Sequence, residues 1–228
     1  MPRQPRYFIP DISQHVVSRG IDKQAVFFRA IDYTLYLDAL REASAEHDCQ
    51  IHAYVLMTNH VHLLVTPGHD RSLPLMMQAM GRTYVQRLNR RYQRTGTLWE
   101  GRYRACLVQN DSYFMTCQRY IELNPVRALM VPKPGDYAYS SYAHHAWGSS
   151  NSLLSTHACY EALHRQPEAR PRAYRALFED EFSEEDLNTI RIRTNACSVI
   201  GNDQFKQQIE EMLGRELPSG KRGRPKKK

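Results

Sequence analysis

Apolar and polar positions along the first half of the chain form a pattern that predicts strands and helices in turn. Stretches that are alternating or continuously apolar indicate strands, and stretches with an apolar residue every three or four positions indicate amphipathic helices. The predicted strands are residues 14–18, 49–57, 60–66 and 101–108, and the predicted helices are residues 28–45, 72–94 and 111–120. This order, β-α-β-β-α-β-α, predicts an α+β fold, a ferredoxin-like antiparallel sheet with helices on one face.

The sequence also predicts which residues begin and end the third helix. Asp111 is predicted to cap its start. The residue before a proline avoids the α region, so Asn124 either ends this helix or caps a new turn that has Pro125 in its first position.

Beyond residue 136 the pattern weakens, and small polar residues place a domain boundary near residue 150. Short helices are predicted at residues 156–163, 173–178, 183–193 and 203–213. Ser183 begins the third of these as a helix cap. We therefore expect a main domain at residues 1–148, a helical C-terminal appendage at 149–216, and a basic tail at 217–228 that is disordered when free.

The composition is that of a folded globular protein, because 42% of the residues are hydrophobic and 10% are aromatic. No apolar run approaches the roughly 20 residues needed to cross a bilayer, and the N-terminal residues do not resemble a secretory signal. The five cysteines include no Cys-x-x-Cys pair, which argues against a disulfide framework or a zinc knuckle. We expect a cytoplasmic protein with reduced cysteines and no membrane partner.

Positive charge is concentrated in two segments of the chain. The net charge is +7, and six basic residues lie within residues 221–228. A second group of seven arginines, with one acidic residue among them, lies between residues 82 and 104. Such segregation is typical of proteins that bind nucleic acids, and it suggests association with the nucleoid. The arginines that we expect to contact DNA are Arg82, Arg90, Arg102, Arg104, Arg222 and Arg224.

Two short motifs carry residue types suited to metal-assisted phosphoryl transfer. In a strand, His60 and His62 point to the same face while Val61 points to the other, so two imidazoles can converge on one cation. In a helix, Tyr120 and Asn124 share a face. Two neutral imidazoles and an amide oxygen leave a divalent cation its full charge for polarising a phosphodiester. Each motif alone also has an ordinary explanation, since most buried tyrosines only pack and a His-x-His pair arises by chance.

Around these motifs the sequence resembles the REP-associated tyrosine transposases, which belong to the single-tyrosine HUH endonucleases. His60-Val61-His62 matches the His-hydrophobic-His pattern of that family, and residues 120–128 match its tyrosine motif. The resemblance continues in residues 98–105 and 15–20, and it covers roughly residues 5–145.

This resemblance implies a metal-dependent enzyme with the HUH endonuclease fold that nicks and rejoins single-stranded DNA. Tyr120 is then the nucleophile that forms a 5'-phosphotyrosine, and His60 and His62 bind Mg²⁺ or Mn²⁺. Asn124 stands where the wider class often has a glutamine as third ligand. The family acts on repetitive extragenic palindromes (REP elements) and cuts beside an imperfect hairpin. A monomer and a homodimer both remain open.

The same residues could also belong to proteins of two other functional classes. A non-catalytic protein that binds hairpin DNA or regulates genes has no need of His60, His62 and Tyr120 together. A replication initiator or relaxase is disfavoured because the motif holds one tyrosine, and we interpret Tyr113 as core packing. The tail resembles an AT-hook, in which Arg222 and Arg224 would enter the minor groove of A·T-rich duplex, although it could also bind phosphates without specificity.

Overall fold

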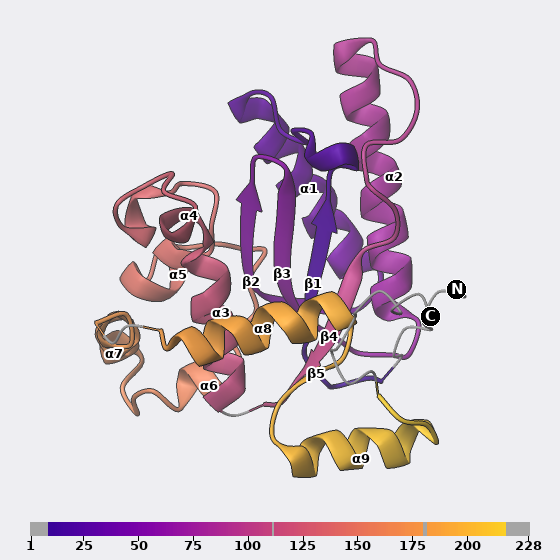
Figure 1. Ribbon diagram of the computed structural model, residues 1–228. Coiled ribbons are helices and arrows are strands. Elements are labelled where there is room, and N and C mark those ends of the chain that lie inside the picture. Colours follow the sequence, from indigo (N-terminus) through magenta and orange to yellow (C-terminus); the bar gives the residue numbers. More distant parts are fainter. Residues whose placement is uncertain (1–8, 111, 180–181, 218–228) are drawn as a thin grey trace, which may run out of the picture.

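Four segments form strands where the sequence predicts them, and a short fifth strand completes one sheet. The computed structural model describes residues 9–110, 112–179 and 182–217. The strand order is β2-β3-β1-β4-β5, and all neighbours are antiparallel except β4 and β5 (Figure 1). The strands are β1 (Gln14–Arg19), β2 (Cys49–Met57), β3 (His60–Pro67), β4 (Arg104–Val108) and β5 (Val199–Ile200).

The helices confirm the predicted order through the third helix. They are α1 (Ala30–Glu46), α2 (Ser72–Tyr92), α3 (Ser112–Glu122), α4 (Asn124–Arg127), α5 (Tyr142–Trp147), α6 (Ala158–Glu161), α7 (Arg170–Ala176), α8 (Glu184–Ala196) and α9 (Asp203–Leu213). Three short 3-10 turns lie at Ile21–Lys23, Pro134–Asp136 and Pro167–Ala169. The α+β class and the ferredoxin-like sheet are therefore confirmed.

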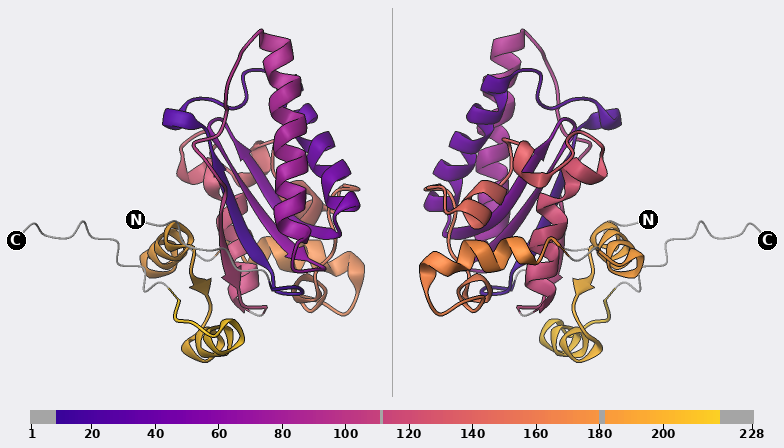
Figure 2. Two further views of the ribbon diagram at one scale, coloured as in Figure 1. Left: turned by 90° about the vertical axis from the view of Figure 1, so that its right-hand side faces the viewer. Right: turned by 90° about the vertical axis from the view of Figure 1, so that its left-hand side faces the viewer.

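The placement of the helices differs from the expectation that they cover one face of the sheet. α1 and α2 pack on one face, and α3 and α8 pack on the other (Figures 1 and 2). The reason lies in the strands, because both faces of β2 and β3 are apolar. Leu56 and Leu63 are buried against α1 and α2, whereas Val55 and Leu64 are buried against α3. A sheet that is apolar on both faces must be covered on both.

The segment that follows the predicted boundary near residue 150 contributes to the sheet as well as carrying helices. β5 runs parallel to β4, with Leu107 opposite Val199, and α8 crosses the face of both strands (Figure 1). α5 and α7 pack together around Tyr142 and Tyr174. Neither α5 nor β5 was predicted, since a helix of six residues and a strand of two give almost no periodic signal.

Three helix boundaries predicted from the sequence, those at Asp111, Asn124 and Ser183, have different outcomes. The hydroxyl of Ser183 accepts a bond from the Asp186 backbone N–H, so the predicted cap of α8 is confirmed. Asn124 takes neither of the two predicted positions. It is the first residue of α4, and Leu123 is the cap. The predicted cap Asp111 lies outside the described residues.

The expectations from composition concerned the cysteines and the possibility of a membrane-spanning helix. All five cysteines are free, and three of them (Cys49, Cys106 and Cys117) are buried. Within the described ranges, no helix combines the length and the apolar character that a bilayer crossing requires.

Candidate active site

The histidine pair lies on the α3 face of the sheet, as strand alternation predicts. His62 is opposite Val17 of β1, and His60 is opposite Arg19. The centroids of the two imidazole rings are 5.1 Å apart. His62 is only 6% exposed, and His60 is half-buried. The two rings are therefore close enough to bind one cation from the same side of the strand.

A hydrogen bond from the hairpin turn orients His60. Asn59 donates through its amide nitrogen to the Lys23 carbonyl, at 2.9 Å, so its amide oxygen faces the Nδ1 of His60 at 2.6 Å. Because that oxygen can only accept, the His60 proton lies on Nδ1. The Nε2 lone pair of His60 is left for a ligand or a cation.

A third imidazole, that of His15 on β1, contacts His62 directly. His15 Nε2 lies 2.7 Å from His62 Nδ1, and His15 Nδ1 lies 3.0 Å from the hydroxyl of Thr194 on α8. The His15 and His62 rings are stacked, with centroids 5.0 Å apart. His15 is completely buried. The contact therefore forms a continuous chain from the C-terminal segment to the histidine pair.

The direction in which protons are donated along the hydrogen bonds between His62, His15 and Thr194 decides what His62 can bind. His62 can bind a cation through Nε2 only when its own proton lies on Nδ1. In that case His62 donates to His15 Nε2, and His15 donates from Nδ1 to the Thr194 oxygen. The opposite direction places the His62 proton on Nε2 and blocks coordination there. Hydrogen-bonded partners of this kind orient metal-binding histidines in many proteins.

Burial keeps these imidazoles neutral. Desolvation lowers the pKa of His15 from its usual 6.5 to about 3 and that of His60 to about 4, where Arg19 also contributes. The pKa of His62 falls well below its usual value, because burial and then the charges of its neighbours disfavour the imidazolium. A neutral imidazole has the lone pair that metal coordination needs.

The tyrosine of the second motif meets the histidines edge-on. Tyr120 lies in the last turn of α3 and is 5% exposed. Its ring centroid is 6.0 Å from that of His62 and 5.8 Å from that of His15, with nearly perpendicular planes. The guanidinium carbon of Arg127, on α4, lies 4.5 Å from the centre of the Tyr120 ring. Elements distant in sequence thus bring the Tyr120 phenol, two histidines and the Arg127 guanidinium together.

Arg127 carries an unused hydrogen-bond donor in this position. One of its terminal nitrogens is buried without a hydrogen-bond partner among the described residues. A buried donor of a charged group is costly unless something accepts from it. An anion at this point, beside the phenol, would satisfy it.

Asn124 lies one turn beyond Tyr120 and turns its amide nitrogen towards α3. That nitrogen donates to the carbonyls of Tyr120 and Ile121, at 2.9 and 3.2 Å. The amide oxygen is consequently the atom of Asn124 that remains for a cation, which is the atom a hard divalent ion prefers.

The donor set fits a divalent cation of the Mg²⁺ or Mn²⁺ type. His60 and His62 offer neutral nitrogens whose opposite ring atoms are engaged, and Asn124 offers an oxygen. No cluster of three His, Cys, Asp or Glu side chains in the described ranges has metal-holding geometry. A cation at this position would therefore depend on the amide and on water or substrate for further ligands.

A family model and two solved structures are similar to this chain. Residues 9–124, just over half of the chain, match the family model described as transposase IS200-like. The chain belongs to the IS200-like transposase family. Its structure is similar to that of a REP-associated tyrosine transposase bound to a REP hairpin, with a TM-score of 0.57 and 17% sequence identity, over 69% of this chain and 93% of that one.

A second solved structure is less similar to this chain. A structure assigned as a transposase from Deinococcus radiodurans R1 matches with a TM-score of 0.36 and 19% identity, over 57% of this chain and 92% of that one. No curated protein matches the sequence. The first structural relative shows that the fold is shared, and the family model identifies the class.

Sequence reasoning missed a buried acid two residues after the tyrosine. Glu122 is completely buried in the α3 core of the transposase. Its carboxylate accepts from Ser141 at 2.6 Å, from His145 at 2.8 Å and from Tyr174 at 2.7 Å. These donors come from α5, its cap and α7. The network ties the end of the Tyr120 helix to the C-terminal half of the chain.

The arginines predicted to contact DNA are distributed over the surface of the transposase. Arg82 and Arg90 are exposed on α2, Arg102 is exposed two residues before β4, and Arg104 is exposed at the first position of β4. Arg104 also donates to the side chain of Asn195 on α8. The remaining two, Arg222 and Arg224, lie outside the described residues together with most of the basic tail.

The residues missed by sequence reasoning differ in how they could have been found. His15 follows the alternation that places His15, Val17 and Arg19 on one face, but only strand pairing shows that this face carries His62. Glu122 and Arg127 lie inside the tyrosine motif itself. A charged residue on the apolar side of a predicted helix is a signal that it has a buried partner.

Proposed function

We propose that this transposase cleaves and rejoins single-stranded DNA beside a hairpin, with Tyr120 as the nucleophile. The observation that carries the proposal is the packing of the Tyr120 ring against His62 and His15 while Arg127 lies over the same ring. A binding module has no use for a buried phenol enclosed by two linked imidazoles and an unsatisfied guanidinium.

Tyr120 attacks the phosphorus of one phosphodiester. A bond forms between the phenol oxygen and phosphorus, and the bond from phosphorus to the 3'-oxygen breaks. The phenol proton is lost to water, and the departing 3'-oxygen takes a proton from water. The products are a 5'-phosphotyrosine and a free 3'-hydroxyl, and the reverse attack by a 3'-hydroxyl joins strands without an external energy source.

The other residues orient the reacting groups. Arg127 binds a non-bridging oxygen of the phosphate through the nitrogen that lacks a partner, and it counters the charge that develops there. His60, His62 and Asn124 would hold a divalent Mg²⁺ or Mn²⁺ ion. That ion, when bound, polarises the phosphate as a Lewis acid. His15 and Asn59 keep the two histidine rings in the tautomer suited to this role.

The DNA partner follows from charge. Arg82, Arg90, Arg102 and Arg104 are exposed and have phosphates as their natural ligands. Since the similar solved structure holds a REP hairpin, we propose a hairpin with a single-stranded flank as the substrate. Arg222 and Arg224 of the tail would add contacts to duplex DNA, so removal of residues 220–228 should weaken binding and flatten its salt dependence.

The test is formation of a covalent adduct. The protein is incubated with a 3'-end-labelled hairpin oligonucleotide from its own genomic neighbourhood, with Mg²⁺, Mn²⁺ or a chelator, and run on a denaturing gel. We expect an adduct that requires the metal and disappears in Tyr120→Phe. Tyr113→Phe is the matched control, because this tyrosine lies on the same helix and packs against the same core. Tight hairpin binding by the wild type without any adduct would instead establish a non-catalytic binding protein.

A further inference from the structure

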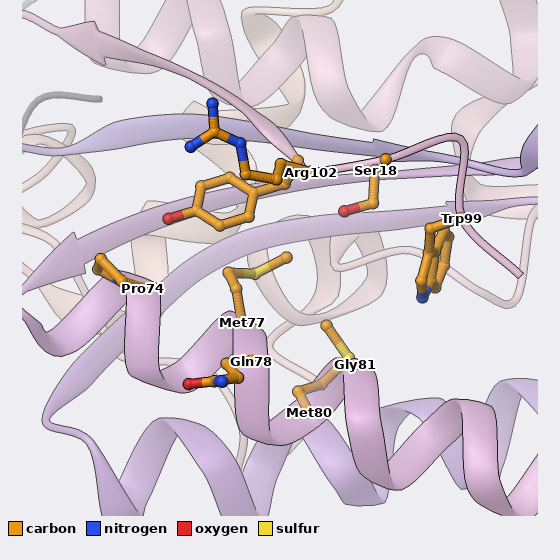
Figure 3. Close-up of a pocket in the computed structure, with 10 residues that line it drawn as sticks. Ser18, Pro74, Met77, Gln78, Met80, Gly81, Trp99 and Arg102 are labelled. Carbon is orange, nitrogen blue, oxygen red and sulfur yellow. The ribbon is translucent and has the colours of Figure 1, made fainter. Parts of the chain in front are cut away.

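A pocket of about 410 Å³ lies between α2 and the segment that leads into β4 (Figure 3). Ser18, Trp99 and Arg102 line it from the sheet side, and Met77, Gln78 and Gly81 line it from α2 (Figure 3). Ser18 pairs with Val61 of β3, whose side chain belongs to the core under α1 and α2. The pocket therefore lies on the opposite face of the sheet from His62 and Tyr120.

The indole of Trp99 forms a fixed aromatic wall. Two buried tyrosines, Tyr36 and Tyr84, meet it with ring centroids 6.4 and 6.3 Å away. The backbone around it is tied to the end of β1, because Ile21 donates to the Leu98 carbonyl and Glu100 donates to the Arg19 carbonyl. Trp99 is itself half-buried, so part of its ring remains accessible. A ring held in this way loses little conformational entropy when a ligand stacks on it.

The remaining lining suits a flat, polar-edged ligand. Met77 and Met80 supply soft, polarisable surface, which favours contact with aromatic rings. Ser18 and Gln78 supply a hydroxyl and an amide at the polar edge. The lining residues include exposed Arg102 and no acidic side chain. Arg102 would therefore attract an anionic group attached to the ligand.

The entrance is kept open by two glycines. A Cβ built on Gly81 or on Gly101 meets no atom within 4 Å, so both positions face open space. Gly81 stands in the middle of α2, where glycine weakens a helix relative to alanine. The next residue of α2, Arg82, is exposed and supplies a second cation one position along the helix. A side chain at position 81 would narrow the pocket without disturbing the fold.

We propose that this pocket binds one unpaired nucleobase of the DNA, stacked on Trp99, with the flanking phosphates at Arg102 and Arg82. The volume falls within the range of roughly 300–1,000 Å³ typical of small-molecule sites. Base stacking on an aromatic residue combined with phosphate contacts is the usual mode of single-strand recognition. The proposal rests on the proposed function, in that it names a subsite for the same DNA away from the reacting phosphate.

Tryptophan fluorescence tests this inference directly, since the chain has two tryptophans, Trp99 and Trp147. In a Trp147→Phe protein, the emission reports on Trp99 alone. The titrants are an oligothymidylate and an oligonucleotide of equal length made of abasic sites, which keeps the phosphates and removes the bases. We expect saturable quenching by the oligothymidylate and none by the abasic strand, and roughly 5- to 150-fold weaker binding of the abasic strand.

Gly81→Leu in the same background supplies the second measurement. It should abolish the quenching and lower the affinity for oligothymidylate to that for the abasic strand, because leucine fills the pocket. Gln86→Leu is the matched control, since it adds the same side chain at an exposed position of the same helix. Both variants should unfold at a temperature close to that of the parent protein.

The outcomes separate this inference from the proposed function. Equal binding of the two oligonucleotides, with no quenching and no effect of Gly81→Leu, would overturn the base pocket even if the Tyr120 adduct forms. Quenching that Gly81→Leu removes, in a protein that forms no adduct, would leave the pocket standing and overturn the proposed chemistry.

Discussion

His15 on β1 and His62 on β3 share a hydrogen bond of 2.7 Å between Nε2 of the former and Nδ1 of the latter. The bond joins a completely buried imidazole to the more buried of the two histidines predicted to bind the metal. It connects the candidate metal site to Thr194 on α8, which lies far outside the matched family region. The C-terminal segment therefore reaches the candidate site through hydrogen bonds that run from Thr194 to His15 and His62.

Replacing His15 should weaken metal binding without removing a ligand. In His15→Leu, the Nδ1 of His62 loses its acceptor and the ring loses its fixed tautomer, so we expect Mn²⁺ affinity to fall roughly 10- to 100-fold. His15→Gln should retain most of the affinity, because its amide oxygen can accept from His62 Nδ1. Free Mn²⁺ measured by electron paramagnetic resonance gives both affinities in the absence of DNA. Equal affinities for wild type and His15→Leu would refute this role.

Arg127 should affect the rate of the reaction more than the affinity for DNA. If its unpartnered nitrogen binds the reacting phosphate, Arg127→Gln should slow adduct formation at saturating DNA by about 100-fold, as expected for loss of one charged donor. Arg127→Lys should recover part of the rate, since it restores the charge but not the planar geometry. Single-turnover adduct formation measures the rate, and fluorescence anisotropy measures the affinity. A loss of affinity as large as the loss of rate would assign Arg127 to DNA binding alone.

The elements of this fold differ in how well the sequence predicts them. β2 and α9 begin and end at the predicted residues, because each is a long periodic stretch between clear turns. β5 exists through its pairing with Leu107 and Val108 of β4, which no local pattern reveals. In the candidate active site, too, the local pattern predicts only part of the arrangement. Alternation predicts that His60 and His62 share a face, but the neighbour on that face, His15, is set by the register of β1 against β3.

Glu122 should matter for stability, because three donors converge on its buried carboxylate. Glu122→Gln replaces one accepting oxygen with an NH₂ group that faces a donor, so we expect the free energy of unfolding to fall by about 3 kcal/mol. Glu42→Gln is the control, since Glu42 forms an exposed pair with Arg87 at 3.4 Å and should change stability by less than about 1 kcal/mol. Urea unfolding followed by circular dichroism compares the two. A similar small change in both variants would show that the buried network adds no stability.

The arginines of α2 should determine how DNA affinity depends on salt. Arg82 and Arg90 are exposed, whereas Arg87 pairs with Glu42. Each phosphate contact to single-stranded DNA contributes about 0.7 to the slope of log affinity against log salt. The double variant Arg82→Gln, Arg90→Gln should therefore lower the slope by about 1.4, and Arg87→Gln should change it little. Anisotropy titrations at several salt concentrations give the slopes, and an unchanged slope in the double variant would place the DNA elsewhere.

His52 should make the protein less stable in mild acid. Its Nδ1 donates to the Ser155 carbonyl at 2.9 Å, and its Nε2 accepts from the Thr66 hydroxyl at 2.9 Å, so the buried ring is held neutral. Burial lowers the His52 pKa from 6.5 to about 4. Between these two values the unfolded chain binds more protons than the folded one, so the free energy of unfolding must fall as the pH drops from 6.5 towards 4.

The variant His52→Gln isolates this contribution, because glutamine cannot take up a proton in that range. We expect the wild type to lose stability between pH 7 and pH 5, and the variant to lose about 1–2 kcal/mol less over the same interval. His164→Gln is the control, since this histidine is exposed. Urea midpoints at both pH values give the comparison. Parallel losses in all three proteins would mean that the acid sensitivity arises at other groups, while a flatter dependence in His52→Gln alone assigns it to the contact between β2 and residue 155.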